Sequence, residues 1–138
     1  MPFMVVYFSR GGKTGKVAAV IAQELGCESA DLAKGQPDIS GVDLLVAGSG
    51  TYGGMPGQAL LEFLKGIPQA KGGRAAIFVT SAGPDPKSLP RIGAALEERG
   101  YSIVSTFHCR GQLMLANRGH PDEKDLENAR AFARDLKK

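Results

Sequence analysis

The residues of this sequence best suited to chemistry form one short glycine-rich stretch. Before it, Met4–Phe8 is an apolar run rich in β-branched and aromatic residues, which predicts a strand buried on both faces. After it, Lys13–Leu25 carries apolar residues at helical spacing. A turn from a strand into a helix offers backbone N–H groups at the positive end of the helix dipole, which favours phosphate, and its hydroxyl and cationic side chains strengthen that preference. The stretch consists of Ser9, Arg10, Gly11, Gly12, Lys13 and Thr14.

Spacing excludes two well-known nucleotide motifs at this turn. A triphosphate-binding loop needs a glycine, four residues and then Gly-Lys-Ser/Thr, but Tyr7 stands where that first glycine is required. A dinucleotide fingerprint needs glycines at relative positions one, three and six, whereas the glycines here are 11, 12 and 15. Two interpretations remain, another kind of phosphate-binding turn and a plain strand-to-helix connection without a ligand.

The elements that must position this turn follow from the periodicity of the chain. Apolar runs predict interior strands at 4–8, 42–47 and 75–80. More polar segments predict edge strands at 27–32 and 101–107. Helical spacing predicts helices at 13–25, 56–67, 87–99 and 122–138. A long loop is expected over 108–121.

Five strands alternating with four helices predict an α/β fold, a doubly wound parallel sheet with helices on both faces and one domain over 1–138. Placing the two polar strands at the edges gives the strand order 2-1-3-4-5, with its switch point between the first and third strands. A second glycine-rich loop, 48–56, follows the third strand, and a third loop, 81–86, follows the fourth. The carboxyl ends of parallel strands lie at one edge of a sheet, so the three loops are expected to meet.

Several motifs resemble the flavodoxin family. Phe8 and the Ser9–Thr14 turn are similar to the family's Ser/Thr-x-Ser/Thr-Gly-x-Thr phosphate turn, although Gly11 stands where the family usually has a hydroxyl. Thr51-Tyr52-Gly53-Gly54, with Pro56, resembles the Thr-Tyr-Gly-Gly pattern of many flavodoxin-like proteins. The segments 107–111 and 119–126 are similar to the tail of short flavodoxin-family domains, so the resemblance extends over the whole chain.

The resemblance implies non-covalent FMN, with the first loop on the phosphate and the other two around the isoalloxazine ring. Tyr52 or Met55 would pack on the ring face, because the sequence has no Trp. Gly53-Gly54 would allow a peptide to flip toward the ring N5, and Ser81-Ala82-Gly83 would offer N–H groups to the pyrimidine edge. The expected cofactor-binding residues are Ser9, Arg10, Gly11, Gly12, Lys13, Thr14, Thr51, Tyr52, Gly53, Gly54, Met55, Ser81, Ala82 and Gly83.

The implied function is electron transfer through FMN, with a redox protein or a small-molecule electron acceptor as partner and no catalytic side chain or metal. An NAD(P)H-dependent flavin or quinone reductase of the same fold is the first alternative. A flavin-free interaction or signalling domain is the second. A phosphorylated receiver domain is disfavoured, because Ser9-Arg10 and Ser49-Gly50 stand where it needs acidic residues.

The amino-acid composition and charge exclude several other classes of function. The 138 residues are 43% hydrophobic and 22% charged, as in globular proteins, and the net charge of +3 is spread along the chain. The sequence lacks the basic stripe with aromatic platforms that would predict nucleic-acid binding. It also lacks an apolar run that would predict a membrane span or a signal peptide. Cys27 and Cys109 lack metal-ligand spacing and suit a cytoplasmic setting with free thiols. His108 is interpreted as a solvated or packed residue, and His120, before Pro121, as a helix-start residue.

Overall fold

The computed structural model describes residues 3–10, 12–52, 55–70, 72–81, 87–110 and 122–137. Its strands are β1 Phe3–Phe8, β2 Ser29–Asp31, β3 Leu44–Tyr52, β4 Met55–Pro56, β5 Gly73–Ser81 and β6 Tyr101–Arg110. Its helices are α1 Lys13–Leu25, α2 Gln58–Gly66, α3 Ser88–Glu98 and α4 Glu123–Leu136. The predicted residues Gly11, Gly53, Gly54, Ala82 and Gly83 lie outside the described residues.

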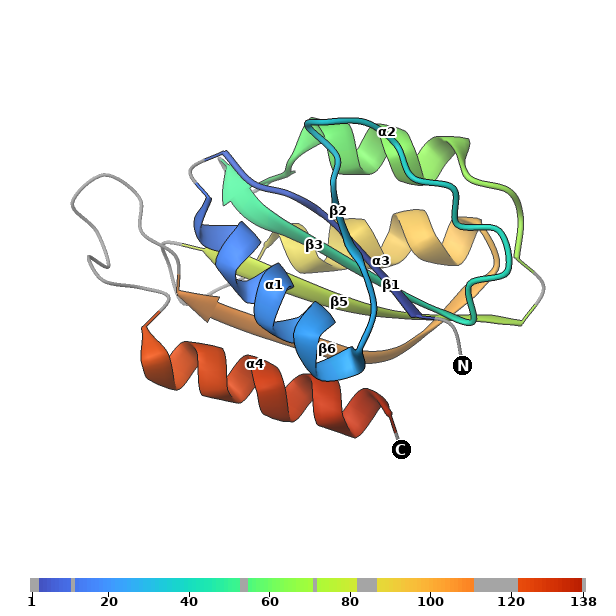
Figure 1. Ribbon diagram of the computed structural model, residues 1–138. Helices are drawn as coiled ribbons and strands as arrows, with labels where there is room; N and C mark the ends of the chain where they lie inside the picture. Colours follow the sequence, from blue (N-terminus) through green and yellow to red (C-terminus); the bar gives the residue numbers. More distant parts are fainter. Residues whose placement is uncertain are drawn as a thin grey trace.

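The sheet has the predicted architecture. Five parallel strands run in the order β2-β1-β3-β5-β6, which is the predicted 2-1-3-4-5 with the strands renumbered. Helices α1 and α4 cover one face and α2 and α3 the other (Figure 1). The doubly wound α/β fold is therefore confirmed.

The core consists of two apolar layers, one on each face of the sheet. Adjacent residues of a strand point to opposite faces, so Val5 packs under α1 and α4 while Val6 packs under α2. Strands β3 and β5 are buried over most of their length, as expected for interior strands covered on both faces. This double burial fixes where β1, β3 and β5 end, and thereby the edge from which the predicted loops emerge.

One short strand was not predicted. Met55–Pro56 forms β4, an antiparallel hairpin partner of Thr51–Tyr52, and α2 begins only at Gln58. The prediction that Pro56 opens the helix was therefore wrong. The hairpin extends β3 beyond the parallel sheet and places Met55 directly opposite Tyr52.

The edge strand β6 contains a bulge that changes which face its side chains meet. Ile103 pairs with Ala75 and Ser105 with Ala76, so Val104 is left without a register partner and is 46% exposed. Before the bulge Ile103 packs with the α2/α3 layer, whereas after it Phe107 packs with the α1/α4 layer. Strand β6 also continues to Arg110, so the predicted loop over 108–121 was wrong at its start.

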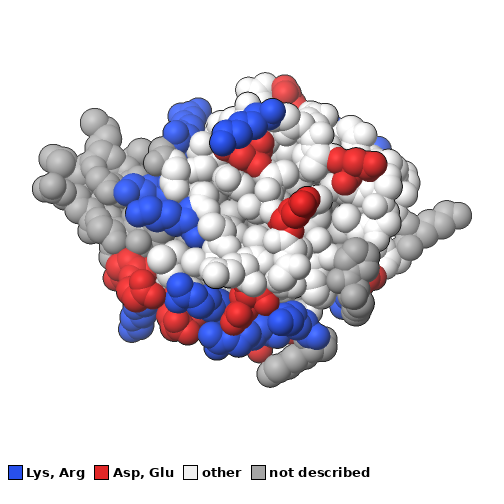
Figure 2. Space-filling model, viewed as in Figure 1, with Lys and Arg blue, Asp and Glu red and all other residues white. Residues whose placement is uncertain are grey.

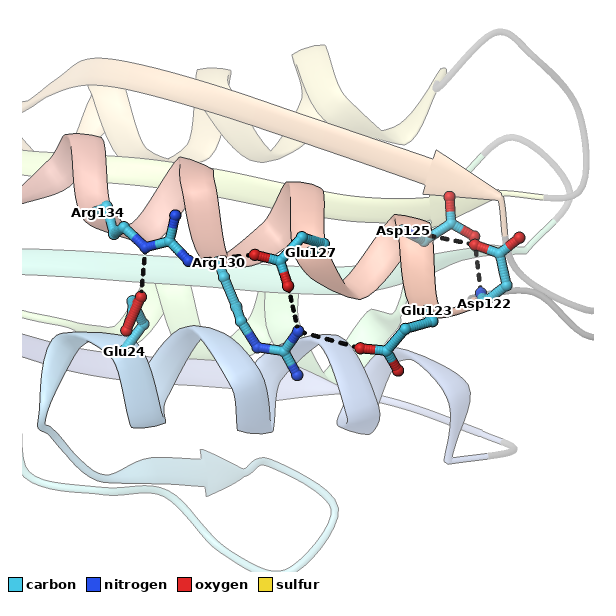
Figure 3. Close-up of polar contacts among 7 residues, drawn as sticks. All are labelled: Glu24, Asp122, Glu123, Asp125, Glu127, Arg130 and Arg134. Carbon is cyan, nitrogen blue, oxygen red and sulfur yellow. Dashed lines mark hydrogen bonds and ion pairs between the residues drawn. The ribbon is translucent and has the colours of Figure 1, made fainter.

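A surface ion pair joins α4 to α1, and others lie within α4. Arg134 Nε donates to Glu24 Oε1 of α1 at 2.6 Å, whereas Arg130 Nη1 reaches Glu127 and Glu123 of its own helix (Figure 3). Charged side chains of both signs follow one another along α4 in Figure 2. Exposed pairs of this kind contribute little individually, so the apolar layer beneath α4 does most to hold it in place.

Candidate functional site

The candidate site lies where β1, β3 and β5 end. Strand β1 leads into the Ser9–Thr14 turn, β3 into the hairpin with β4, and β5 ends at Ser81. Buried polar residues gather at this edge. The described residues that are both buried and polar are Thr14, Ser49, Thr80, Ser81 and Ser88. All of them carry hydroxyls, and each lies at a strand's carboxyl end or in a first helical turn, so polarity is concentrated at one edge of an otherwise apolar core.

The turn into α1 is held by backbone geometry and one hydroxyl. Gly12 N–H donates to Ser9 Oγ at 3.0 Å, and Gly12 has φ 81°, a left-handed conformation that favours glycine. No side chain caps α1, and no acidic residue lies in its first turn. The amides of that first turn have no acceptor within the helix, so they form a donor set suited to an anion.

Thr14 points into the protein. It is 2% exposed, and its Oγ1 lies 2.8 Å from Thr80 Oγ1, a hydrogen bond in which either hydroxyl can be the donor. This contact joins the first turn of α1 to the end of β5. Thr80 was not singled out from the sequence, although a threonine at the carboxyl end of an apolar strand is a signal that could have found it.

Tyr52 lies against the first loop. Arg10 N–H donates to Tyr52 Oη at 3.1 Å, and the Arg10 guanidinium carbon lies 4.2 Å from the centroid of the Tyr52 ring. Phe8 meets the same ring edge-on, with centroids 6.1 Å apart. Gly50 makes room for this arrangement, because a Cβ there would stand 2.6 Å from Tyr52 Oη. The first and second loops are thereby brought together, as predicted.

Hydroxyls also fix the rest of the second loop. Ser49 Oγ donates to Gly50 O at 2.7 Å and accepts Gly57 N–H at 2.8 Å, so it ties the end of β3 to the start of α2. Thr51 Oγ1 lies 2.7 Å from Ser88 Oγ at the first residue of α3. Sequence reasoning missed Ser49 as a functional residue, and it missed Ser88 too, whose partner is 37 residues away along the chain.

Met55 and Ser81 differ sharply in exposure. Met55 is 38% exposed, which is unusual for a large apolar side chain, whereas Ser81 is 5% exposed. Met55 therefore offers apolar surface at the carboxyl edge. Ser81 is the last residue of β5 and the last described residue before the third loop.

Cys109 and His108 end the neighbouring strand β6. His108 is exposed, while Cys109 is buried beneath α4. Burial raises the pKa of the Cys109 thiol to about 12, with the charges of Asp125 and Asp122 adding to the effect. The thiol therefore packs in the core as a small apolar group.

A cavity of about 380 Å³ lies at the opposite, amino edge of the sheet, between the segment 36–42 and the residues after α2. Its acidic side chain, Asp38, accepts Ser40 N–H at 2.9 Å and so serves the local turn. None of the five buried Ser and Thr side chains named above lines this cavity. The chemistry therefore favours the carboxyl edge despite the volume available at the other.

Comparison with known proteins identifies the family. The family model described as a flavodoxin domain matches residues 4–117. An uncharacterized protein of Methanocaldococcus jannaschii is 31% identical over 150 residues, covering 100% of this chain and 99% of that protein. The chain therefore belongs to the flavodoxin domain family.

Solved structures agree on the fold. A short-chain flavodoxin associated with a bacterial microcompartment superposes with a TM-score of 0.77 at 19% identity, covering 99% of this chain and 97% of that one. The flavodiiron protein from Giardia intestinalis gives a TM-score of 0.71 at 21% identity, covering 98% of this chain but 35% of that one. The same fold thus occurs alone in the first protein and as part of a longer chain in the second.

Two kinds of feature are absent from the described part of the chain. Within it, no cluster of three or more His, Cys, Asp or Glu side chains is arranged to hold a metal ion. Among the same residues, no helix is long and apolar enough to span a membrane.

Proposed function

We propose that this protein binds FMN without a covalent bond at the carboxyl edge of its sheet and transfers electrons through it. The observation that carries the proposal is the convergence of two loops on one uncapped helix terminus, where Tyr52 of the second loop bonds the backbone of Arg10 in the first. Family membership supports the choice of a flavin, since flavodoxin-family proteins generally bind one.

The residues present fit a phosphate dianion. The first turn of α1 combines amides that lack acceptors within the helix with the cation Lys13, and Arg10 lies just before it. No carboxylate lies in that turn to repel an anion. Ser9 Oγ already accepts a hydrogen bond from Gly12, which leaves the hydroxyl proton to be donated. We infer that Ser9, Arg10, Gly11, Gly12, Lys13 and Thr14 hold the phosphate.

Thr14 has a more indirect part in this assignment. Its hydroxyl is bonded to Thr80, so it orients the first turn of α1 against β5, and it can donate outward only when Thr80 supplies the proton of their shared hydrogen bond. Its backbone N–H, by contrast, belongs to the first turn of the helix and is available to an anion.

The other two loops are proposed to surround the flavin ring. Met55 offers exposed apolar surface there. The remaining members of the proposed set are Thr51, Tyr52, Gly53, Gly54, Ser81, Ala82 and Gly83. FMN, when bound, supplies one- and two-electron transfer, and the protein's part is to hold it, shield one face from water and tune its potential through nearby N–H groups.

The proposed partner is a redox protein or a small-molecule electron acceptor, and the proposed setting is the cytoplasm. The net charge of +3 favours a partner with an acidic docking surface over a basic one. No side chain of the chain is assigned a catalytic proton transfer.

The test is retention of FMN. The purified protein is incubated with excess FMN and passed through gel filtration, and we expect the flavin absorption bands to elute with the protein. Elution of all FMN in the free-ligand volume, even after loading at high micromolar concentration, would remove the basis of the proposal. Rapid NAD(P)H oxidation with a quinone and no protein partner would instead favour the reductase alternative.

A further inference from the structure

The Tyr52 side chain directly contacts Arg10 of the proposed phosphate turn. Its hydroxyl oxygen is 3.1 Å from Arg10 N, and its ring lies beneath the Arg10 guanidinium at 4.2 Å. The side chain reaches this position by folding back over Gly50, where any Cβ would collide with the phenol oxygen at 2.6 Å. Two separate features, a glycine in β3 and an arginine in the turn, therefore support the same orientation of one side chain.

The Tyr52 hydroxyl retains a proton to donate. A phenol can accept and donate at once, and here it accepts from the Arg10 amide. In the described part of the chain no residue accepts the phenol proton in return. The sequence also lacks a hydroxyl at Gly11, one position farther along the same turn.

We propose that the Tyr52 hydroxyl donates a hydrogen bond to the phosphate of the bound flavin nucleotide and replaces the side-chain donor absent at Gly11. This inference rests on the proposed function and refines it, because it assigns a residue of the second loop to the phosphate rather than to the isoalloxazine ring. Tyr52 thereby becomes a residue that distinguishes FMN from riboflavin.

The surroundings of the ring support this division of roles. Arg10 covers one face of Tyr52, and Phe8 contacts the same ring edge-on at 6.1 Å. A flavin ring that stacked on the face of Tyr52 covered by Arg10 would have to displace the guanidinium. Met55, its partner across the β3–β4 hairpin, is 38% exposed and needs no such rearrangement to contact the flavin.

The experiment compares two ligands that differ only in the phosphate. Dissociation constants for FMN and riboflavin are measured by calorimetry for the wild type, Tyr52→Phe and Tyr52→Leu. Tyr52→Phe keeps the ring and its packing while removing the hydroxyl. Tyr101→Phe, which removes a tyrosine hydroxyl at the amino end of β6, is the matched control, and circular dichroism verifies the fold of each variant.

We expect Tyr52→Phe to weaken FMN binding by roughly tenfold, the range for a hydrogen bond to a charged group, and to change riboflavin binding by less than about twofold. Tyr101→Phe should leave both affinities unchanged. Equal loss for the two ligands in Tyr52→Phe would overturn the inference. So would an unchanged Tyr52→Phe together with a Tyr52→Leu variant that loses both ligands, because the ring would then stack on the flavin. If the wild type binds neither ligand, the proposed function itself fails, and that result is visible before any variant is compared.

Discussion

The amino-terminal ends of α1 and α4 differ in whether the chain itself supplies acceptors for their first backbone amides. Both helices begin with amides that lack intrahelical acceptors. At α4 the chain provides the acceptors itself, since Asp122 and Asp125 form a capping box with hydrogen bonds of 2.9 Å and Glu123 adds a further acid (Figure 3). At α1 the cap is Gly12, no acid lies in the first turn, and cations flank it.

The capped terminus of α4 contributes to stability, whereas the uncapped terminus of α1 is available for binding. At the α4 terminus the chain supplies its own acceptors. Burial raises the pKa of the nearby Cys109, and the charges of Asp125 and Asp122 add to that rise, although a helix amino terminus usually lowers a thiol pKa. The α1 terminus lacks that internal compensation, which costs some helix stability and leaves a site for an external anion. Exchanging features between the two termini should therefore move stability and flavin affinity in opposite directions.

The largest effect is expected from reversing a charge at α1. Lys13→Glu should weaken FMN binding by about 2 kcal/mol or more, because a carboxylate replaces a cation close to the phosphate. The same change should stabilise the helix by roughly 0.3–1 kcal/mol through the dipole. Titration calorimetry and urea unfolding measure the two quantities. Lys124→Glu, in the first turn of α4, is the control and should leave FMN affinity unaltered, whereas an equal loss in both variants would mean that only net charge matters.

A smaller effect is expected from the conformation of the α1 cap. Gly12→Ala forces a Cβ onto a residue with φ 81°, and since nothing lies within 4 Å of that Cβ, the cost is backbone strain alone. It should lower the free energy of unfolding by roughly 1–2 kcal/mol. Gly66→Ala is the matched control, because its Cβ also meets nothing within 4 Å and its φ is not positive. Urea unfolding should show a lower free energy of unfolding for Gly12→Ala but not for Gly66→Ala. Equal stability of the two variants would contradict the assigned turn.

Removal of the α4 cap should affect stability alone. Asp122→Ala deletes the acceptor for Asp125 N–H and should cost about 1 kcal/mol of unfolding free energy, with FMN affinity unchanged. Thermal melts and FMN titrations of the same preparation check both statements. A variant that kept full stability but lost FMN would show that α4, not α1, contributes to the binding site.

The smallest effect at neutral pH concerns Cys109. Its pKa in the folded protein is raised from 9.0 to about 12, so between these values the folded state holds a proton that the unfolded state releases. Stability from this group is therefore complete below pH 9 and is lost as the pH rises toward 12. The free energy of unfolding, measured in urea across this pH range, should fall less steeply with pH for Cys109→Ala than for the wild type. Identical slopes would indicate an ordinary thiol pKa.

Much of the fold could be predicted because the determining signals are local. Polar residues in the segments that became β2 and β6 placed those strands at the edges, and this fixed the strand order. Helix α1 ends at Leu25 as predicted, and Gly26 follows it with a left-handed φ of 69°. Apolar runs without interruption identified β1, β3 and β5 as interior strands.

The features that were missed depend on contacts between distant residues. Pro56 has the local signature of a helix start, yet it pairs with Thr51 in the β3–β4 hairpin. The bulge at Val104 is visible only when β6 is aligned against β5. The Thr14–Thr80 hydrogen bond joins residues 66 positions apart, so no spacing rule applied to the sequence could have paired them.

The most direct test of the account is to locate the flavin on the protein. FMN is titrated into ¹⁵N-labelled protein, and amide chemical shifts are followed at both edges of the sheet. We predict that the largest changes occur at Arg10, Gly12, Lys13, Thr14 and Tyr52, and that the residues lining the amino-edge cavity, 36–42, change little. Changes concentrated at 36–42, or no changes at saturating FMN, would contradict the assignment of flavin binding to the carboxyl edge.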